Sequence, residues 1–97
     1  MESVAHSLDA LKAELVRDLP PEEAPLLAWP MICGARVAGR THPVRFEAGV
    51  LTIAVPDRQW KSELEAFAGQ YQAAYARVLP RAVSAIRFEV EGEKAAR

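Results

Sequence analysis

The chain has 97 residues, which suits one domain, and 51% of them are hydrophobic while 26% are charged, as in ordinary folded globular proteins. Its single cysteine excludes an internal disulfide, and no apolar run reaches the roughly 20 residues that a membrane span requires. The N-terminus, MESVAHSLDA, has no secretory signal pattern, so we expect a cytoplasmic protein with no membrane partner.

Charge is unevenly distributed along the chain, although the formal net charge is only −1. Residues 1–28 hold six acidic and two basic residues, whereas residues 29–88 hold eight basic and four acidic residues. A basic middle region can attract a polyanion such as nucleic acid. A dipolar, solvated surface without such a partner explains the same pattern, so charge alone leaves both interpretations open.

An apolar stripe predicts a helix over roughly residues 4–19. Branched aliphatic side chains recur there at steps of three or four residues, the spacing of one helix face. They are Val4, Leu8, Leu11, Leu15 and Leu19. Two prolines follow and end the helix, because neither can donate a helical hydrogen bond. Residues 1–25 are therefore expected to form this helix and a short linker over residues 20–25.

A second helix is predicted over about residues 26–40. Pro25 suits its first turn. Pro30 would clash with the carbonyl of Leu26 inside a regular helix, so the helix either starts near Trp29 or is kinked there. Trp29 is expected to lie in the core, and Cys33 is expected to be a small buried hydrophobic residue on the apolar face.

Two runs of alternating apolar residues, 43–47 and 50–55, flank Ala48-Gly49 and predict a β-hairpin. If Val44 and Phe46 are buried, Arg45 and Glu47 point from the open face of the hairpin. A long helix should follow from a cap at Asp57 to about residue 79, with a possible division at Gly69. A last strand is predicted over residues 83–90, followed by a polar tail over 91–97.

This order predicts an α+β fold with one three-stranded sheet and helices packed on one face. The last strand is expected beside one strand of the hairpin. If Gly69 divides the long helix, residues 26–90 have the order α-β-β-α-α-β of a type II KH-like domain, preceded by an extra N-terminal helix.

The sequence offers no constellation of residues that suits catalysis or metal binding. His6, His42 and Cys33 follow no metal-ligand spacing, and Cys33 has no base predicted beside it. A phosphate-cradling glycine motif and a facing pair of carboxylates are also absent from the sequence. We therefore expect a non-enzymatic binding protein with no metal, no cofactor and no small-molecule substrate.

The segment from Trp29 to Leu64 carries the most specific signal. A tryptophan precedes a glycine-containing helix that ends in Thr-His-Pro, and a Gly-Val-Leu-Thr-Ile hairpin strand and Trp-Lys-Ser-Glu-Leu follow. With the closing Ala-Ile-Arg-Phe-Glu-Val, the pattern resembles the DciA family of bacterial replicative-helicase loaders over about residues 26–90. The resemblance implies a KH-like domain in the bacterial cytosol that contacts the replicative DNA helicase and binds single-stranded or forked DNA, without hydrolysing ATP.

Five basic residues are the candidates for nucleic-acid binding: Arg36, Arg40, Arg45, Arg58 and Lys61. Helical spacing places the first two on one face, and also the last two. We expect all five to share one positive surface that meets phosphates. The Gly-x-x-Gly loop with which KH domains clamp phosphates is absent, so side-chain charge would have to make the contact.

Trp60 is the candidate for partner binding, because it occupies the tryptophan of the family's Trp-x-x-Glu-Leu pattern. The alternative is a core position beside Leu64. The function expected is that of a replication accessory protein that assists helicase loading. The alternatives are a single-stranded nucleic-acid binder such as an RNA-associated protein, or a protein-interaction module whose acidic first helix docks a basic partner.

Overall fold

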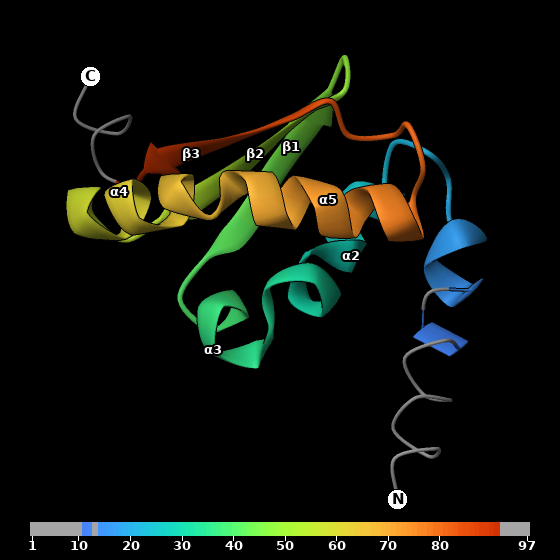
Figure 1. Ribbon diagram of the computed structural model, residues 1–97, viewed down its shortest axis with the longest axis horizontal. Helices are drawn as coiled ribbons and strands as arrows, with labels where there is room; N and C mark the ends of the chain where they lie inside the picture. The colour runs from blue at the N-terminus through green and yellow to red at the C-terminus, as the bar shows by residue number, and fades with distance from the viewer. Residues whose placement is uncertain (1–10, 13, 92–97) are drawn as a thin grey trace, which may run out of the picture.

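The computed structural model describes residues 11–12 and 14–91, which form an α+β fold with one three-stranded sheet. In chain order the elements are α2 (Ala24–Cys33), α3 (Ala35–Ala38), β1 (His42–Glu47), β2 (Val50–Val55), α4 (Arg58–Ala66), α5 (Ala68–Val78) and β3 (Ala85–Val90). Residues 11–12 and 14–17 are also helical, and we call them the N-terminal helix. Figure 1 shows the helices below the sheet. The α+β class and the three-stranded sheet are confirmed, whereas the KH-like assignment stays a prediction.

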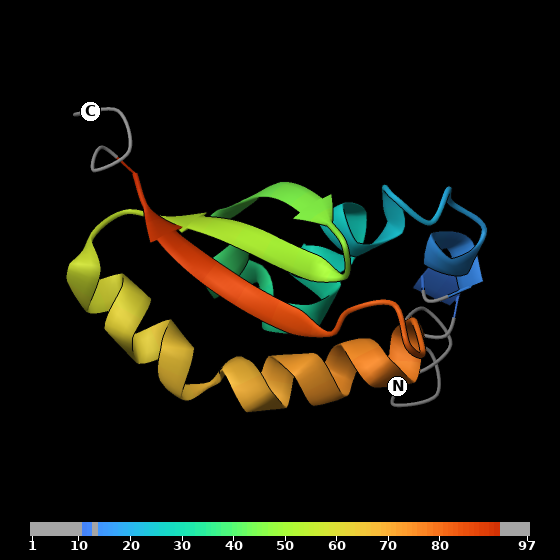
Figure 2. The ribbon, with the colours of Figure 1, turned by 90° about the horizontal axis from the view of Figure 1, so that it is seen from above.

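Strand β2 is the centre of the sheet, antiparallel to β1 and parallel to β3. The parallel connection runs through α4 and α5, which lie along one side of the sheet in Figure 2. Leu51, Ile53 and Val55 are fully buried and form the central row of the core. The predicted hairpin and its pairing with the last strand are confirmed, although β3 begins at Ala85, two residues later than expected.

The hairpin turns at Ala48 and Gly49, whose φ angles of 52° and 80° both lie in the left-handed region. Two such residues between the paired Glu47 and Val50 are typical of a type I′ turn. The register shifts between Pro43 and Arg45, and Val44 is 41% exposed. The condition that Val44 is buried is therefore not met, because Pro43 cannot donate to the ladder and the strand bulges there.

One predicted helix over residues 26–40 is in fact two helices, divided at Gly34, whose φ is 89°. Helix α2 begins at Ala24, with Pro25 in its first turn as predicted. It continues through Pro30, so the alternative start near Trp29 is wrong. The last two residues of the predicted linker, Ala24 and Pro25, therefore belong to α2, and both are buried.

The long helix is divided as well, but at Phe67 and not at Gly69, which lies inside α5. The N–H of Phe67 donates to the carbonyl of Leu64, three residues back, and its ψ of 3° turns the chain. This bend lets α4 pack against β2 and β3 while α5 packs against α2 and β3. The predicted cap is confirmed, since Asp57 Oδ1 accepts the N–H of Trp60 at 2.9 Å.

The N-terminal helix is attached through Arg17, whose guanidinium donates to the carbonyls of Val78 (2.9 Å) and Arg77 (3.3 Å) at the end of α5. This attachment turns Val16 into the core, where it is 7% exposed, and leaves Leu15 59% exposed. Leu11 is also 51% exposed. The predicted leucine stripe is therefore not buried at these two residues, and Val4 and Leu8 lie outside the described residues. The helix also ends at Arg17, before residue 19.

Candidate nucleic-acid interface

Helix α3 and the turn after it present two basic side chains to solvent. Arg36 lies in α3 and Arg40 follows it, and both are exposed. The break at Gly34 starts this short helix in a new direction, and the N–H of Arg40 closes the turn on the carbonyl of Val37 at 3.0 Å. No acidic residue occurs between Ala24 and Phe46. Within residues 11–12 and 14–91, neither arginine forms an ion pair.

Arg58 and Lys61 lie in the first turn of α4 and are brought together as predicted. They line a shallow depression of about 310 Å³ with Ser62, Glu65 and Val90. The depression lies where the ends of β3 and α4 meet. Because Glu65 shares it, the local charge is partly balanced.

Arg45 lies apart, on the open face of the sheet. Its Nη2 is 3.4 Å from Glu89 Oε1, and His42 Nε2 is 3.1 Å from Glu91 Oε2. Arg87 on β3 lies opposite Thr52 on β2 in the strand register, and its side chain is exposed. Glutamates thus accompany the basic residues on this face, which makes it close to neutral rather than strongly positive.

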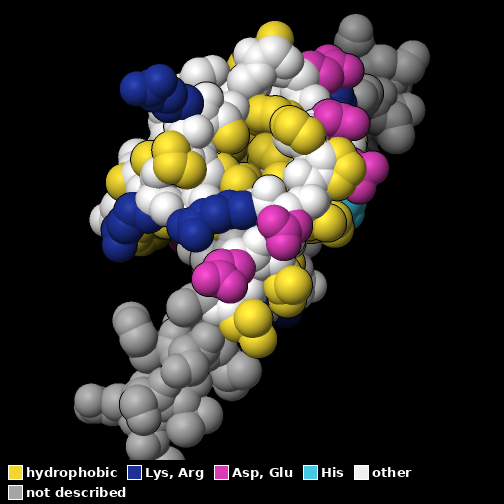
Figure 3. Space-filling view, turned by 90° about the vertical axis from the view of Figure 1, so that its right-hand side faces the viewer, with side chains coloured by type: hydrophobic (Ala, Val, Ile, Leu, Met, Phe, Trp, Pro, Cys, Tyr) yellow, Lys and Arg dark blue, Asp and Glu magenta, His cyan; other side chains and the backbone are white. Residues whose placement is uncertain are grey.

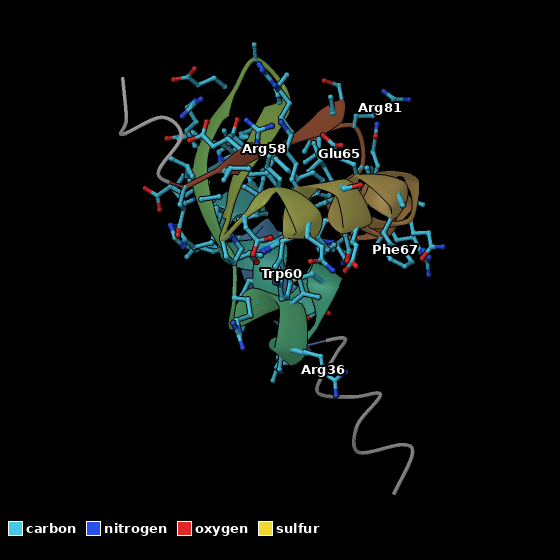
Figure 4. The ribbon with its side chains drawn as sticks, turned by 90° about the vertical axis from the view of Figure 1, so that its left-hand side faces the viewer. Arg36, Arg58, Trp60, Glu65, Phe67 and Arg81 are labelled. Atoms are coloured by element: carbon cyan, nitrogen blue, oxygen red, sulfur yellow. The ribbon has the colours of Figure 1, made fainter. Side chains whose placement is uncertain are left out.

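Trp60 lies between Arg58 of α4 and Arg36 of α3. In Figure 4 the side chain of Arg58 lies above α4, Trp60 lies below α4 on the side of α3, and Arg36 lies lowest. The structure therefore brings the five candidates together as two pairs, one on α3 and its turn and one on α4, with Arg45 elsewhere. Tertiary structure, not helical spacing, decides this arrangement.

Trp60 combines features of both interpretations given to it. Its ring packs against the hydrophobic core, as expected of an anchor beside Leu64. The residue is only half-buried, however, so part of it stays accessible next to the basic side chains. An accessible aromatic surface beside arginines suits stacking of an unpaired base or contact with a protein partner.

A further group of basic residues, not predicted as a site, lies at the end of α5. Arg77 and Arg81 are exposed, and their spacing of four residues could have drawn attention to them. Figure 3 shows basic side chains on the end of the molecule that carries the N-terminal helix, together with acidic ones. The N-terminal segment supplies the exposed acids Glu14, Asp18, Glu22 and Glu23. This end is consequently less positive than its arginines suggest.

Cys33 is half-buried, and burial raises the pKa of its thiol from 9.0 to about 11. A thiol with a raised pKa is a poor nucleophile at neutral pH. In the part of the chain that the structure describes, no group of three or more His, Cys, Asp or Glu side chains could hold a metal ion. No helix among those residues is both long enough and apolar enough to cross a bilayer.

Comparison with protein families gives one match that covers most of the chain. The model of the family described as "Dna[CI] antecedent, DciA" matches residues 3–88. A search of curated proteins gives no match. The family match includes every element described above except the last residues of β3.

Proposed function

Because the chain belongs to the DciA family, a family of replication-associated helicase loaders, we propose that it is a non-enzymatic accessory protein that binds the replicative DNA helicase and single-stranded or forked DNA. In this proposal the protein assists loading of the helicase and supplies binding surfaces, not chemistry. The predicted nucleic-acid contacts at Arg36, Arg40, Arg45, Arg58 and Lys61 remain part of the proposal, with unequal support.

One observation supports DNA binding most strongly: the exposed pair Arg36 and Arg40 forms no ion pair within the described residues, in a stretch without acids. A guanidinium without a carboxylate partner is available to a phosphate and gains affinity by releasing counterions. Trp60 lies next along this end of the molecule, and its accessible part could stack on a base. Lys61 extends the charge onto α4. Arg45 is the weakest candidate, because Glu89 already neutralises it.

The test is binding of a fluorescently labelled single-stranded DNA across a salt series, measured by anisotropy. The variant Arg36→Ala/Arg40→Ala is compared with Arg77→Ala/Arg81→Ala, which removes the same charge from exposed positions at the end of α5. For single strands each lost phosphate contact lowers the salt slope by about 0.7, so the first variant should lose about 1.4. Equal loss in both variants, or a larger loss at the α5 end, would reject the α3 surface.

An RNA oligonucleotide of the same length and sequence decides between the proposed function and its nucleic-acid alternative. Tighter binding to RNA than to DNA would favour an RNA-associated role. A forked DNA should bind at least as tightly as the single strand, because it offers the same unpaired backbone and additional phosphates.

We also propose that Trp60 contacts a protein partner, the role expected from its place in the family pattern. Retention of the helicase by the immobilised protein measures this directly, with Trp60→Leu as the variant. Leucine keeps an apolar side chain in the half-buried position and removes the aromatic surface. Unchanged retention, with an unchanged melting temperature, would leave Trp60 as a core anchor only.

A further inference from the structure

Helix α2 is apolar on every side, yet Leu27 and Pro30 leave one of its sides exposed. Its sequence, APLLAWPMIC, contains no charged side chain. Ala24, Pro25, Ala28 and Trp29 are buried. Leu27 on the outer side is 57% exposed. A helix that is hydrophobic all round is normally covered all round, and none of the described residues covers the outer side of α2 at Leu27.

A groove runs along this outer side, between α2 and the N-terminal helix. It has a volume of about 500 Å³, and its apolar lining comes mainly from Leu15 and Val16 on one side and Leu27, Pro30 and Met31 on the other. The hydrogen bonds of Arg17 to the end of α5 hold the N-terminal helix in place, so the groove has two fixed walls. Leu11, one turn before Leu15 and 51% exposed, extends the apolar surface further.

Among the described residues, Lys12 is the one charged residue that lines the groove, and three exposed acids near its edges outnumber it. Asp18 lies three residues after Leu15, and Glu23 lies four residues before Leu27, so helical spacing places each acid near an exposed leucine. Glu14 lies beside Leu15 in the chain, and all three acids are exposed. Arg17 points its guanidinium to the carbonyls of α5 and does not neutralise this edge. In Figure 3 exposed hydrophobic and acidic side chains lie side by side on this end of the molecule.

We propose that this groove binds an amphipathic helix of a partner protein, one whose apolar stripe is flanked by lysine or arginine. Leu15 and Leu27 of the groove would bury the apolar stripe of the partner helix. The acids at the edges would attract its flanking lysines or arginines, as at other grooves that bind helices. The inference rests on the proposed function, since we take the replicative helicase to be the protein that carries this helix. The groove shares no lining residue with Trp60 or the arginines of α3, so the surfaces can be tested separately.

The test measures the affinity of the full chain for the replicative helicase of its own organism by biolayer interferometry. Leu15→Ser/Leu27→Ser removes both walls of the groove at positions that are more than half exposed. Val44→Ser/Phe67→Ser is the matched control, because these residues are 41% and 46% exposed and lie outside the groove. Glu14→Lys/Glu23→Lys reverses the charge of the edge without touching the apolar lining. Circular dichroism checks that every variant is folded.

We expect the leucine variant to lose at least about tenfold in affinity and the control to lose less than about twofold. The charge reversal should weaken binding most at low salt, since screening reduces the attraction that it removes. Unchanged affinity of the leucine variant for the helicase would overturn the groove and leave the proposed function intact. Absence of binding by the unaltered chain would instead reject the helicase as partner. A dimer in light scattering that the leucine variant abolishes would also overturn the inference, because a second copy would then fill the groove.

Discussion

The indole N–H of Trp29 donates a hydrogen bond to the hydroxyl of Thr41 at 2.9 Å, and the Thr41 hydroxyl donates in turn to the carbonyl of Val37 at 2.8 Å. Trp29 is fully buried at the centre of the core, whereas Val37 belongs to α3. This chain of two bonds fixes α3, and therefore Arg36 and Arg40, relative to the core. Thr41, which follows α3 and its turn and begins the Thr-His-Pro of the family pattern, is thus what positions the proposed DNA surface.

Replacing Thr41 should destabilise the fold and loosen α3 together. Thr41→Val keeps the shape of the side chain but leaves the buried indole N–H of Trp29 without a partner, which costs about 1–3 kcal/mol, while the Val37 carbonyl keeps the N–H of Arg40. Thr41→Ser retains the hydroxyl and should restore most of the loss. Urea unfolding, followed by tryptophan fluorescence, measures the free energy of unfolding of both variants. Equal stability of Thr41→Val and the unaltered chain would show that the bond contributes nothing.

A second buried hydrogen bond, 2.8 Å long, joins the hydroxyl of Tyr75 in α5 to the carbonyl of Pro25 in α2. Burial raises the pKa of Tyr75 above its usual range, consistent with a hydroxyl that stays a donor. Tyr75→Phe should lower the free energy of unfolding by about 0.5–1.5 kcal/mol, because the hydrogen bond that joins α5 to α2 is lost. Tyr71→Phe is the control, since the Tyr71 hydroxyl makes no hydrogen bond within the described residues. Equal effects of the two substitutions would contradict this assignment.

In the hairpin turn, a substitution at Ala48 should increase the stability of the fold, whereas one at Gly49 should decrease it. Ala48 has a φ of 52°, which asparagine tolerates better than alanine, so Ala48→Asn should stabilise by about 0.5–1 kcal/mol. Gly49→Ala should destabilise by about 1–2 kcal/mol. Its new Cβ would also lie 2.7 Å from the Ser84 hydroxyl oxygen. Ala48→Asn should raise the melting temperature and Gly49→Ala should lower it. A shift in the same direction for the two variants would contradict the assignment of the turn.

Cys33 should react slowly with a thiol reagent at pH 8 in the folded protein. With a pKa raised by burial from 9.0 to about 11, the thiolate fraction is about a hundredfold lower than that of an ordinary cysteine. The rate with Ellman's reagent should therefore rise as pH increases between about 9 and 11, and unfolding in urea should remove the protection. The same raised pKa means that the folded state loses stability as pH rises through this window, because the unfolded chain gives up the proton first. Equal rates in folded and unfolded protein would contradict the assignment.

The sequence predicted those elements whose signals are local. Asp57 as a helix cap and Ala48-Gly49 as a turn depend on a few neighbouring residues, and both are confirmed. The mistakes involve longer-range contacts. The stripe through Leu11 and Leu15 points outward because Arg17 binds the end of α5, about 60 residues away in the chain, and helical periodicity cannot reveal that.

The candidate site shows the same limit. Spacing correctly paired Arg58 with Lys61, because both belong to one helical turn. It could not place Arg45, since its partner Glu89 lies on a strand 44 residues later. The direction of α3 depends on the left-handed Gly34 and on the bond from Trp29 to Thr41, and neither has a sequence signature that distinguishes it from a continuous helix.

The amount of replicative helicase that is bound to a forked DNA, with and without this protein, tests the central claim most directly. Cosedimentation with a forked DNA immobilised on beads gives this quantity, and the proposed function predicts that the protein increases it. The Arg36→Ala/Arg40→Ala variant should still bind the helicase but should lose most of the increase, whereas Arg77→Ala/Arg81→Ala should retain it. The same amount of helicase on the DNA with and without the unaltered protein would contradict the proposed function.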